Sequence, residues 1–267
     1  MKVVILCGGK GTRLREETEY RPKPMVPIGN RPILWHIMKT YAHHGFKDFI
    51  LCLGYKGEMI KEYFRNYLWN TCDTTLMLGR TPAVQFHDRH DEEGWSVTLA
   101  DTGEDSMTAY RIKLIERYLG NDSTFLLTYG DGVGNVDIPA VIRQHQRGGK
   151  MCTLTAVHPP GRFGELGLDA HEGVRGFNEK PQAEGGYING GYMVCEREVF
   201  RHLPDDPSVM FEQGPLQQIT QQGQLSAFKH DGFWQPMDTF QEFLLLNRLW
   251  AENKAPWAVW KSAHDAR

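Results

Sequence analysis

The first 25 residues contain a glycine-rich turn surrounded by cations. A short apolar run, residues 3–7, is followed at once by Gly8-Gly9-Lys10-Gly11-Thr12-Arg13. Glycines permit positive φ angles and a close approach of backbone N–H groups to phosphate oxygens, and Arg13 can bind two such oxygens at once. The segment therefore predicts a phosphate-binding loop. A tight strand-to-helix turn with incidental charges is the alternative that the glycines alone leave open.

A second cation, Lys23, is held between two prolines. In Arg21-Pro22-Lys23-Pro24 the proline rings restrict the backbone on both sides of the lysine. A lysine aimed at a phosphate benefits from that rigidity, whereas a solvated lysine does not need it. Two other glycine-loop classes do not fit, because Leu14 stands where a dinucleotide fingerprint needs its third glycine and no Walker Gly-Lys-Ser/Thr occurs. We therefore favour a loop that holds a nucleoside triphosphate with its phosphates open to attack.

The composition is that of a globular chain of ordinary size. It has 267 residues, of which 40% are hydrophobic and 24% charged, so we expect a single domain over residues 1–267. No apolar run approaches the roughly 18–20 residues that cross a bilayer, and residues 3–7 are too few for a signal peptide. The five cysteines are scattered without a Cys-x-x-Cys pair, which suits a reducing compartment. We expect a cytoplasmic protein without membrane contact.

The charge is distributed unevenly along the chain. The net charge of −3 argues against non-specific binding of nucleic acid. Residues 1–31 nevertheless contain seven basic and three acidic side chains, a local charge of +4, so the remainder carries −7. A positive pocket on an acidic body attracts a small anion.

Apolar runs alternate with helical patterns along most of the chain. This alternation predicts an α/β protein in which helices cover both faces of a largely parallel sheet. The terminal aromatic segment 256–260 is expected to pack on its own domain, and a subunit contact remains the alternative. Residues 95–99 alternate as an edge or antiparallel strand would. The predicted strands are 3–7, 49–53, 95–99, 124–128, 152–157, 187–195 and 224–229, and the predicted helices 33–43, 57–67, 108–119, 138–146, 215–222 and 240–250.

The motifs, taken in order, resemble those of the sugar-1-phosphate nucleotidylyltransferases. The resemblance rests first on the loop from Leu6 to Leu14 with Lys23-Pro24-Met25. The whole chain is most similar to members that transfer a cytidylyl group to glucose 1-phosphate. It implies a three-layer, doubly wound mixed sheet, the Rossmann-like fold of nucleotide-diphospho-sugar transferases. We expect the nucleotide-binding half to cover about residues 1–135 and the half for sugar phosphate and oligomerisation about 136–267. Further matching segments are 32–38, 101–103, 106–108, 129–132, 159–164, 179–181, 189–191 and 232–239.

Two aspartates are candidates for a metal site. Asp131 stands between glycines just after a predicted strand, where ligands bind in open α/β sheets, although a turn aspartate explains it equally well. Asp238 by itself is better explained as the N-cap of the helix predicted at 240–250. The resemblance makes Asp131 and Asp238 the ligands of Mg²⁺, an ion that one or two carboxylates hold together with phosphate oxygens and water.

The resemblance also implies roles for the other polar side chains. Arg13, Lys23 and Lys180 are expected to act in catalysis on the β,γ-phosphates, the α-phosphate and the sugar phosphate respectively. Glu179 and Asn189 are associated with the sugar hydroxyls, and Arg162 with Gly161 and Gly164 with the same pocket. The nucleotide site is expected to comprise Leu6, Cys7, Gly8, Gly9, Lys10, Gly11, Thr12, Arg13, Lys23, Ser106, Arg111 and Gly130.

One position departs from the pattern of the similar cytidylyltransferases. Ala109-Tyr110 stands where a glycine pair is usual, so we expect Tyr110 to crowd or stack beside the nucleotide. The implied partners are CTP and a sugar 1-phosphate, without nucleic acid, in a homo-oligomer that is often a hexamer. The implied reaction converts CTP and α-D-glucose 1-phosphate into CDP-glucose and diphosphate. Another nucleotide (dTTP or UTP), another phosphorylated substrate, or a non-catalytic nucleotide-sugar sensor remain the alternatives.

Overall fold

The centre of the molecule is a mixed β-sheet of eight strands. A computed structural model of the chain describes residues 1–79, 83–87, 94–159, 165–168, 174–178 and 186–261. The strands follow the order β13-β10-β14-β8-β1-β4-β7, and β15 pairs with β10. Their bounds are β1 Val3–Leu6, β4 Asp48–Leu53, β7 Ser96–Asp101, β8 Thr124–Tyr129, β10 Cys152–Val157, β13 Ile188–Asn189, β14 Met193–Glu196 and β15 Leu225–His230.

Strand β1 lies in the middle of a parallel block. It pairs with β4 on one side, Val3 opposite Phe49, and with β8 on the other, Val3 opposite Leu126. β7 is parallel to β4 at the edge of the sheet, so the edge position predicted for residues 95–99 is confirmed and the antiparallel alternative is wrong. β14 runs antiparallel to β8, which makes the sheet mixed, as the resemblance implied.

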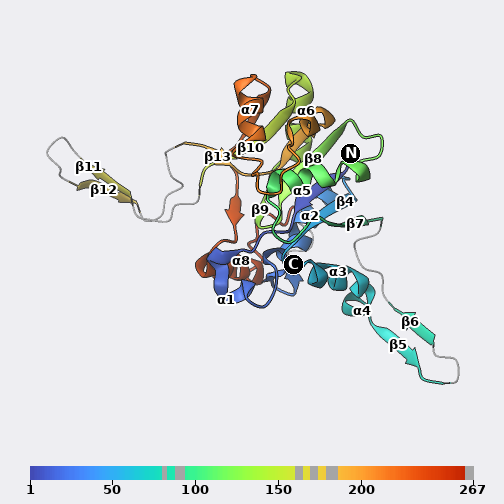
Figure 1. Cartoon of the computed structure of the whole chain (residues 1–267). Helices are drawn as coiled ribbons and strands as arrows, with labels where there is room; N and C mark the ends of the chain where they lie inside the picture. Colours follow the sequence, from blue (N-terminus) through green and yellow to red (C-terminus); the bar gives the residue numbers. More distant parts are fainter. Residues whose placement is uncertain (80–82, 88–93, 160–164, 169–173, 179–185, 262–267) are drawn as a thin grey trace.

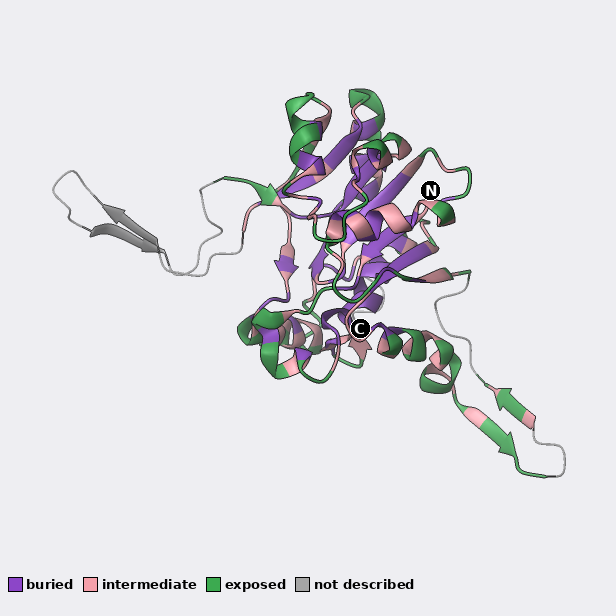
Figure 2. Cartoon of the chain, in the orientation of Figure 1, coloured by how far each residue is buried: buried purple, intermediate pink, exposed green. Residues whose placement is uncertain are grey.

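Helices cover both faces of the sheet, which confirms the three layers. Side chains alternate along β1: Val3 and Ile5 enter one core and Val4 the other, each with none of its surface exposed. Figure 2 shows these strands as the buried centre of the molecule. The first core contains residues of α2 (Ile33–His43), α3 (Gly57–Arg65), α6 (Ile138–Gly148) and α8 (Phe240–Ala251), and the second residues of α5 (Thr108–Leu114), η4 (Arg197–His202) and α7 (Pro215–Gln221).

Among the described residues, four small antiparallel pairs lie outside the main sheet. Two of them, β5–β6 and β11–β12, project from the body in Figure 1, and the hydrophobic pattern predicted neither. Their bounds are β2 Pro27–Ile28 with β3 Arg31–Pro32, β5 Thr74–Met77 with β6 Ala83–Phe86, β9 Gly132–Gly134 with β16 Trp234–Pro236, and β11 Glu165–Leu168 with β12 Val174–Asn178. The remaining elements are η1 Thr12–Leu14, α1 Arg15–Thr18, η2 Lys23–Met25, α4 Tyr67–Thr71 and η3 Glu116–Tyr118.

The predicted strand 187–195 is interrupted in the structure. β13 and β14 are separated by a kink in which Gly191 and Tyr192 have φ of 76° and 45°. The Asn189 carboxamide oxygen accepts a hydrogen bond from the Gly191 N–H at 2.9 Å and stabilises the kink. The alternating apolar pattern hides such a break, because side-chain hydrogen bonds to the local backbone compete with the sheet.

The aromatic segment near the C-terminus packs on its own domain, as expected. Trp257 has none of its surface exposed and stacks on Phe233 and Trp250. In the described part of the chain, none of the helices combines the length and hydropathy that a bilayer crossing requires.

Candidate active site

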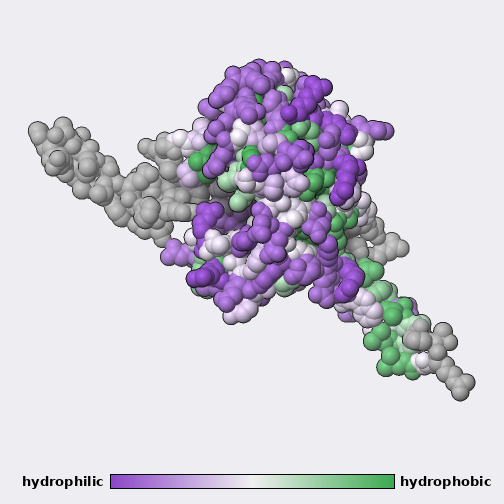
Figure 3. All heavy atoms as spheres, in the orientation of Figure 1, coloured by the Kyte–Doolittle hydropathy of each residue, from purple (hydrophilic) through white to green (hydrophobic). Residues whose placement is uncertain are grey.

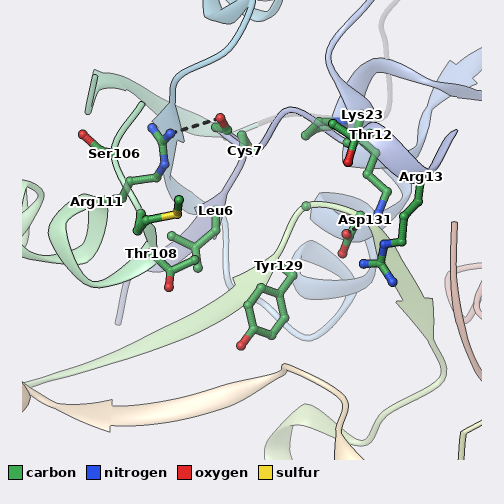
Figure 4. Close-up of a pocket in the computed structure, with 16 residues that line it drawn as sticks. Leu6, Cys7, Thr12, Arg13, Lys23, Ser106, Thr108, Arg111, Tyr129 and Asp131 are labelled. Atoms are coloured by element: carbon green, nitrogen blue, oxygen red, sulfur yellow. Dashed lines mark hydrogen bonds and ion pairs between the residues drawn. The ribbon is translucent and has the colours of Figure 1, made fainter. Parts of the chain in front are cut away.

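A pocket of about 290 Å³ opens at the carboxyl ends of β1 and β8, where the order in which the chain adds strands to the sheet reverses (Figure 4). The chain continues from β1 to β4 on one side and from β8 to β10 on the other, so the loops that follow the neighbouring strands β1 and β8 border one crevice at the carboxyl ends of these strands. The predicted phosphate loop and Asp131 therefore meet at one place. The lining residues are Leu6, Cys7, Gly8, Gly9, Gly11, Thr12, Arg13, Lys23, Pro24, Ser106, Met107, Thr108, Arg111, Tyr129, Gly130 and Asp131.

Two positions of the loop require glycine for steric reasons. Gly11 has φ of 63° and lies just before η1, a conformation that other residues adopt at a cost. A Cβ on Gly8 would lie 2.2 Å from the Arg111 guanidinium. Leu14, which excluded a dinucleotide fingerprint, is fully buried and anchors the loop in the core. The loop is thus shaped by its neighbours as well as by the ligand it is predicted to hold.

Arg111 lines the pocket, but its N–H groups bind backbone carbonyls. From α5 the buried guanidinium donates to the carbonyl oxygens of Leu53, Gly8 and Gly103 at 3.0, 3.0 and 2.7 Å. It also donates to the Glu104 carbonyl at 3.1 Å and to the Thr102 hydroxyl at 2.9 Å. Burial lowers the pKa of Arg111. The side chain joins the loops after β1 and β7 to the last residue of β4.

The other nucleotide-site candidates divide between the pocket and its surroundings. Ser106 lines the pocket, whereas Lys10 is not among the lining residues and forms an exposed ion pair with Asp105 at 2.8 Å. The hydrogen bond to Asp105 raises the pKa of Lys10. Tyr110 is half-buried on α5 and is not among the lining residues either, so the predicted crowding of a nucleotide by this ring has no support in the geometry of the pocket.

Lys23 joins the two aspartates that the resemblance selected. Its ammonium Nζ donates to Asp131 Oδ2 at 2.7 Å and also to Asp238 Oδ1. Arg13 Nη1 binds the other oxygen of Asp238 at 2.7 Å. Figure 4 shows Arg13, Lys23 and Asp131 converging on one side of the pocket. Residues separated by 215 positions are therefore direct neighbours.

A small antiparallel pair of strands that are distant in the sequence brings Asp238 to this place. β9 follows Asp131 directly and pairs with β16, Gly132 opposite Pro236, and the Met237 N–H then donates to the Asp131 carbonyl at 2.8 Å. The N-cap predicted at Asp238 is wrong, because Thr239 caps α8 in a capping box with Glu242. The Asp238 carboxylate is thereby left for the cationic cluster.

The two carboxylates form a donor set that suits a hard cation. Both bind the same Lys23 ammonium, so one positive centre already lies between them. Burial disfavours the Lys23 ammonium, but the charges and hydrogen bonds of Asp131 and Asp238 outweigh burial and raise the pKa of Lys23. Three or more metal-binding side chains are not grouped anywhere among the described residues. A cation bound here would keep coordination positions for phosphate oxygens and water.

The sugar-side candidates are only partly described. Glu179, Lys180, Gly161, Arg162 and Gly164 lie outside the described residues. Asn189 lies beside the pocket, where its Nδ2 donates to the Tyr129 hydroxyl at 3.1 Å. The Tyr129 hydroxyl in turn donates to Glu212 at 2.6 Å. Sequence reasoning missed Glu212, and no motif around it could have revealed the contact.

The fold and the pocket define a transferase of nucleotidyl groups. The profile of the Nucleotidyl transferase family matches residues 2–252, and the chain belongs to this family. It is 52% identical over 98% of its length to the whole glucose-1-phosphate cytidylyltransferase of Salmonella typhi. A probable glucose-1-phosphate cytidylyltransferase of Bacillus subtilis is 44% identical over 97% of this chain and all of the relative.

Solved structures share the fold at low sequence identity. HddC from Yersinia pseudotuberculosis superposes with a TM-score of 0.66 at 22% identity, over 93% of this chain and 99% of HddC. A putative glucose-1-phosphate thymidylyltransferase from Bacillus anthracis gives 0.65 at 19% identity, over 93% and 94% of the two chains. These likenesses confirm the Rossmann-like fold of nucleotide-sugar transferases that the motifs implied.

Proposed function

We propose that this protein is an enzyme that converts CTP and α-D-glucose 1-phosphate into CDP-glucose and diphosphate. The observation that carries the proposal is the cluster of Arg13, Lys23, Asp131 and Asp238 at one wall of the pocket. The full-length similarity to two cytidylyltransferases that act on glucose 1-phosphate supports the choice of substrates. The scattered free cysteines fit a cytoplasmic enzyme.

The proposed chemistry is an in-line displacement. An oxygen of the sugar phosphate forms a bond to the α-phosphorus of CTP, the bond from that phosphorus to the β-phosphate oxygen breaks, and diphosphate leaves with its electron pair. No general base is needed, because the attacking oxygen is already anionic near neutral pH. Catalysis then consists of positioning and charge stabilisation.

Arg13 and Lys23 would change partners when a nucleotide binds. Both cations are bound by the carboxylates of Asp131 and Asp238. We propose that Lys23 moves to the α-phosphate and Arg13 to the β,γ-phosphates, and that backbone N–H groups of residues 8–13 contribute further donors. The carboxylates would keep the cations oriented until then, which reduces the ordering needed on binding.

The carboxylates released in this exchange would hold Mg²⁺. Asp131 and Asp238 supply the oxygen ligands that this ion prefers, and their shared contact with the Lys23 ammonium supports a site in which one ion contacts both. When bound, the ion would neutralise phosphate charge and orient the triphosphate.

For the sugar phosphate, we propose that Lys180 binds the phosphate and that Glu179 and Asn189 bind hydroxyl groups. The Lys180→Ala variant should raise the KM for glucose 1-phosphate by about 10-fold or more, because a charge-assisted hydrogen bond is lost, while the KM for CTP changes little. Initial rates at varied concentrations of each substrate measure both constants. An unchanged kcat/KM for the sugar phosphate would exclude this role.

Release of diphosphate across a panel of nucleotides and sugar phosphates tests the reaction itself. The expected result is the highest kcat/KM for CTP with glucose 1-phosphate. Greater activity with dTTP, UTP or another phosphorylated substrate would reassign the specificity within the same family. Binding of nucleotide sugars in calorimetry without any turnover would instead indicate a sensor.

We also propose that the enzyme is a homo-oligomer that uses the β5–β6 hairpin. Leu76, Met77 and Leu78 are 52%, 52% and 89% exposed, and Figure 3 shows hydrophobic surface gathered on this arm. Exposed apolar patches of this kind are typical of interaction sites. Light scattering on the eluted protein should give a mass several times the 30.6 kDa of one chain, and a monomer would contradict the proposal.

A further inference from the structure

The carboxylate of Glu212 joins two walls of the pocket. Its Oε1 accepts a hydrogen bond from the Tyr129 hydroxyl at 2.6 Å and its Oε2 one from the Thr108 hydroxyl at 2.7 Å. Tyr129 ends β8 and Thr108 begins α5, and both line the pocket. We propose that Glu212 is a positioning residue that fixes the sugar side of the pocket through Tyr129 and Asn189, an inference that rests on the proposed function.

The directions of these hydrogen bonds follow from the chemistry of the groups. An ionised carboxylate only accepts, so both hydroxyls direct their protons to Glu212. The Tyr129 oxygen is then left as an acceptor, and Asn189 Nδ2 donates to it at 3.1 Å. The Asn189 oxygen accepts from the Gly191 N–H at 2.9 Å. Both ends of the carboxamide are therefore assigned, and the amide cannot flip without losing two hydrogen bonds.

The segment that carries Glu212 is fastened to α5. The Met107 N–H donates to the Pro207 carbonyl at 2.7 Å, and the Phe211 N–H donates to the Thr108 hydroxyl at 2.8 Å. Glu212 is therefore held from the side of α5, while its carboxylate reaches Tyr129 on the sheet. Displacing the carboxylate would free the Tyr129 ring and the Asn189 amide together.

A negative charge at this place needs a reason. Among the described residues, Glu212 forms no ion pair, and its two partners are neutral hydroxyls. An anion behind a pocket for two polyanions weakens their attraction, and a neutral amide could fill the same space. The carboxylate differs from an amide in that it accepts from both hydroxyls at once.

The consequence concerns recognition of the sugar. Because one Nδ2–H of Asn189 donates a hydrogen bond to the Tyr129 hydroxyl oxygen, the second N–H of this amide has a fixed direction. Within the part of the chain that the structure describes, no residue accepts a hydrogen bond from it. A donor of fixed direction favours a sugar that offers a hydroxyl oxygen there. Loss of Glu212 should therefore weaken binding of the glucose unit much more than binding of the nucleotide.

Calorimetry with CDP-glucose and with CDP tests the proposal without turnover. In Glu212→Gln the affinity for CDP-glucose should fall by about 10-fold, because one charge-assisted hydrogen bond is replaced by a mismatched donor, while the affinity for CDP changes by less than about threefold. The control Glu198→Gln removes an exposed carboxylate of η4 that pairs with Arg201, and both affinities should stay at the wild-type values.

Tyr129→Phe separates positioning from general damage to the fold. It removes only the phenol oxygen that links Glu212 to Asn189, so it should reproduce the loss for CDP-glucose. Adding Glu212→Gln to it should cause little further loss. A wild-type ratio of the two affinities in Tyr129→Phe, or in a folded Glu212→Gln, would overturn the inference, and so would fully additive losses. A wild-type protein that binds CDP but not CDP-glucose would overturn the proposed function itself.

Discussion

Lys23 and His36 are both buried basic side chains, and they are accommodated in opposite ways. Lys23 is 7% exposed and stays charged between Asp131 and Asp238. His36 has none of its surface exposed, and burial lowers its pKa to about 4. A buried charge needs partners of opposite charge, and a charged ligand can replace such partners. A buried neutral ring needs only fixed hydrogen bonds. The first arrangement suits a reaction site and the second a structural support.

The surroundings of His36 select its neutral form. Trp257 Nε1 donates to His36 Nδ1 at 3.3 Å, so this nitrogen must be unprotonated, and Nε2 donates to the Ile28 carbonyl at 3.1 Å. The ring also lies against Trp250, with 4.6 Å between the ring centroids. A second proton on His36 would face the indole N–H, which cannot accept it. This cluster fastens the C-terminal aromatic segment to α2.

The largest expected effect comes from breaking the charged arrangement at Asp131. Asp131→Asn keeps the shape of the side chain but removes one of the two carboxylates that contact Lys23. The kcat at saturating substrates should fall by roughly 100-fold or more, as when a main electrostatic contact of the transition state is lost. Asp48→Asn, a surface carboxylate paired with Lys2 at the other end of the sheet, is the matched control. Turnover of Asp131→Asn within a few-fold of wild type would remove the metal assignment.

Removing Lys23 sharpens the same comparison without measuring activity. In Lys23→Met the two carboxylates lose their shared ammonium and repel each other, and Mg²⁺ can bind between them without displacing Lys23, while Arg13 keeps its contact with the other oxygen of Asp238. Added Mg²⁺ should therefore raise the melting temperature of this variant by about 3 °C more than that of the wild type. The exposed Lys254, paired with Glu252, gives the control Lys254→Met. Equal effects of Mg²⁺ on all three proteins would show that the ion does not bind between these carboxylates.

The effect expected at His36 concerns the neutral side of the comparison, and it is seen in the pH dependence of stability. The pKa is about 4 in the folded protein against an ordinary value of 6.5. The unfolded chain therefore takes up the proton first, so this stabilisation is complete above pH 6.5 and is lost as the pH falls toward 4. Between pH 7 and 4.5 the loss should be about 2 kcal/mol.

Denaturant unfolding of His36→Asn at the two pH values isolates this contribution. The variant should lose less stability on acidification than the wild type, by about the same 2 kcal/mol. His43→Asn replaces an exposed histidine in the last turn of the same helix and should follow the wild type. Equal acid sensitivity of His36→Asn and wild type would mean that His36 does not contribute in this way.

Much of the fold was predictable because its causes are local. The helix predicted at 33–43 has the observed bounds of α2, and the strand at 152–157 those of β10. The loop 8–13 and the rigid Lys23 were also identified from residue types, since glycine, proline and charge act through the backbone and through short distances. The break at Gly191 and the arms β5–β6 and β11–β12 escaped prediction, because an alternating pattern does not show where pairing stops.

What the sequence by itself determined is the chemical inventory of the site: a glycine loop, Arg13, Lys23 and two aspartates of unknown distance. Only the tertiary structure decided that the β9–β16 pair places Asp238 beside Asp131. It also decided that Arg111 donates hydrogen bonds to backbone carbonyls and that Glu212 accepts one from Tyr129. The physical reason is that residue type and spacing govern contacts within a turn or a strand. Contacts between residues 83 or 215 positions apart depend on how the whole sheet and its loops pack.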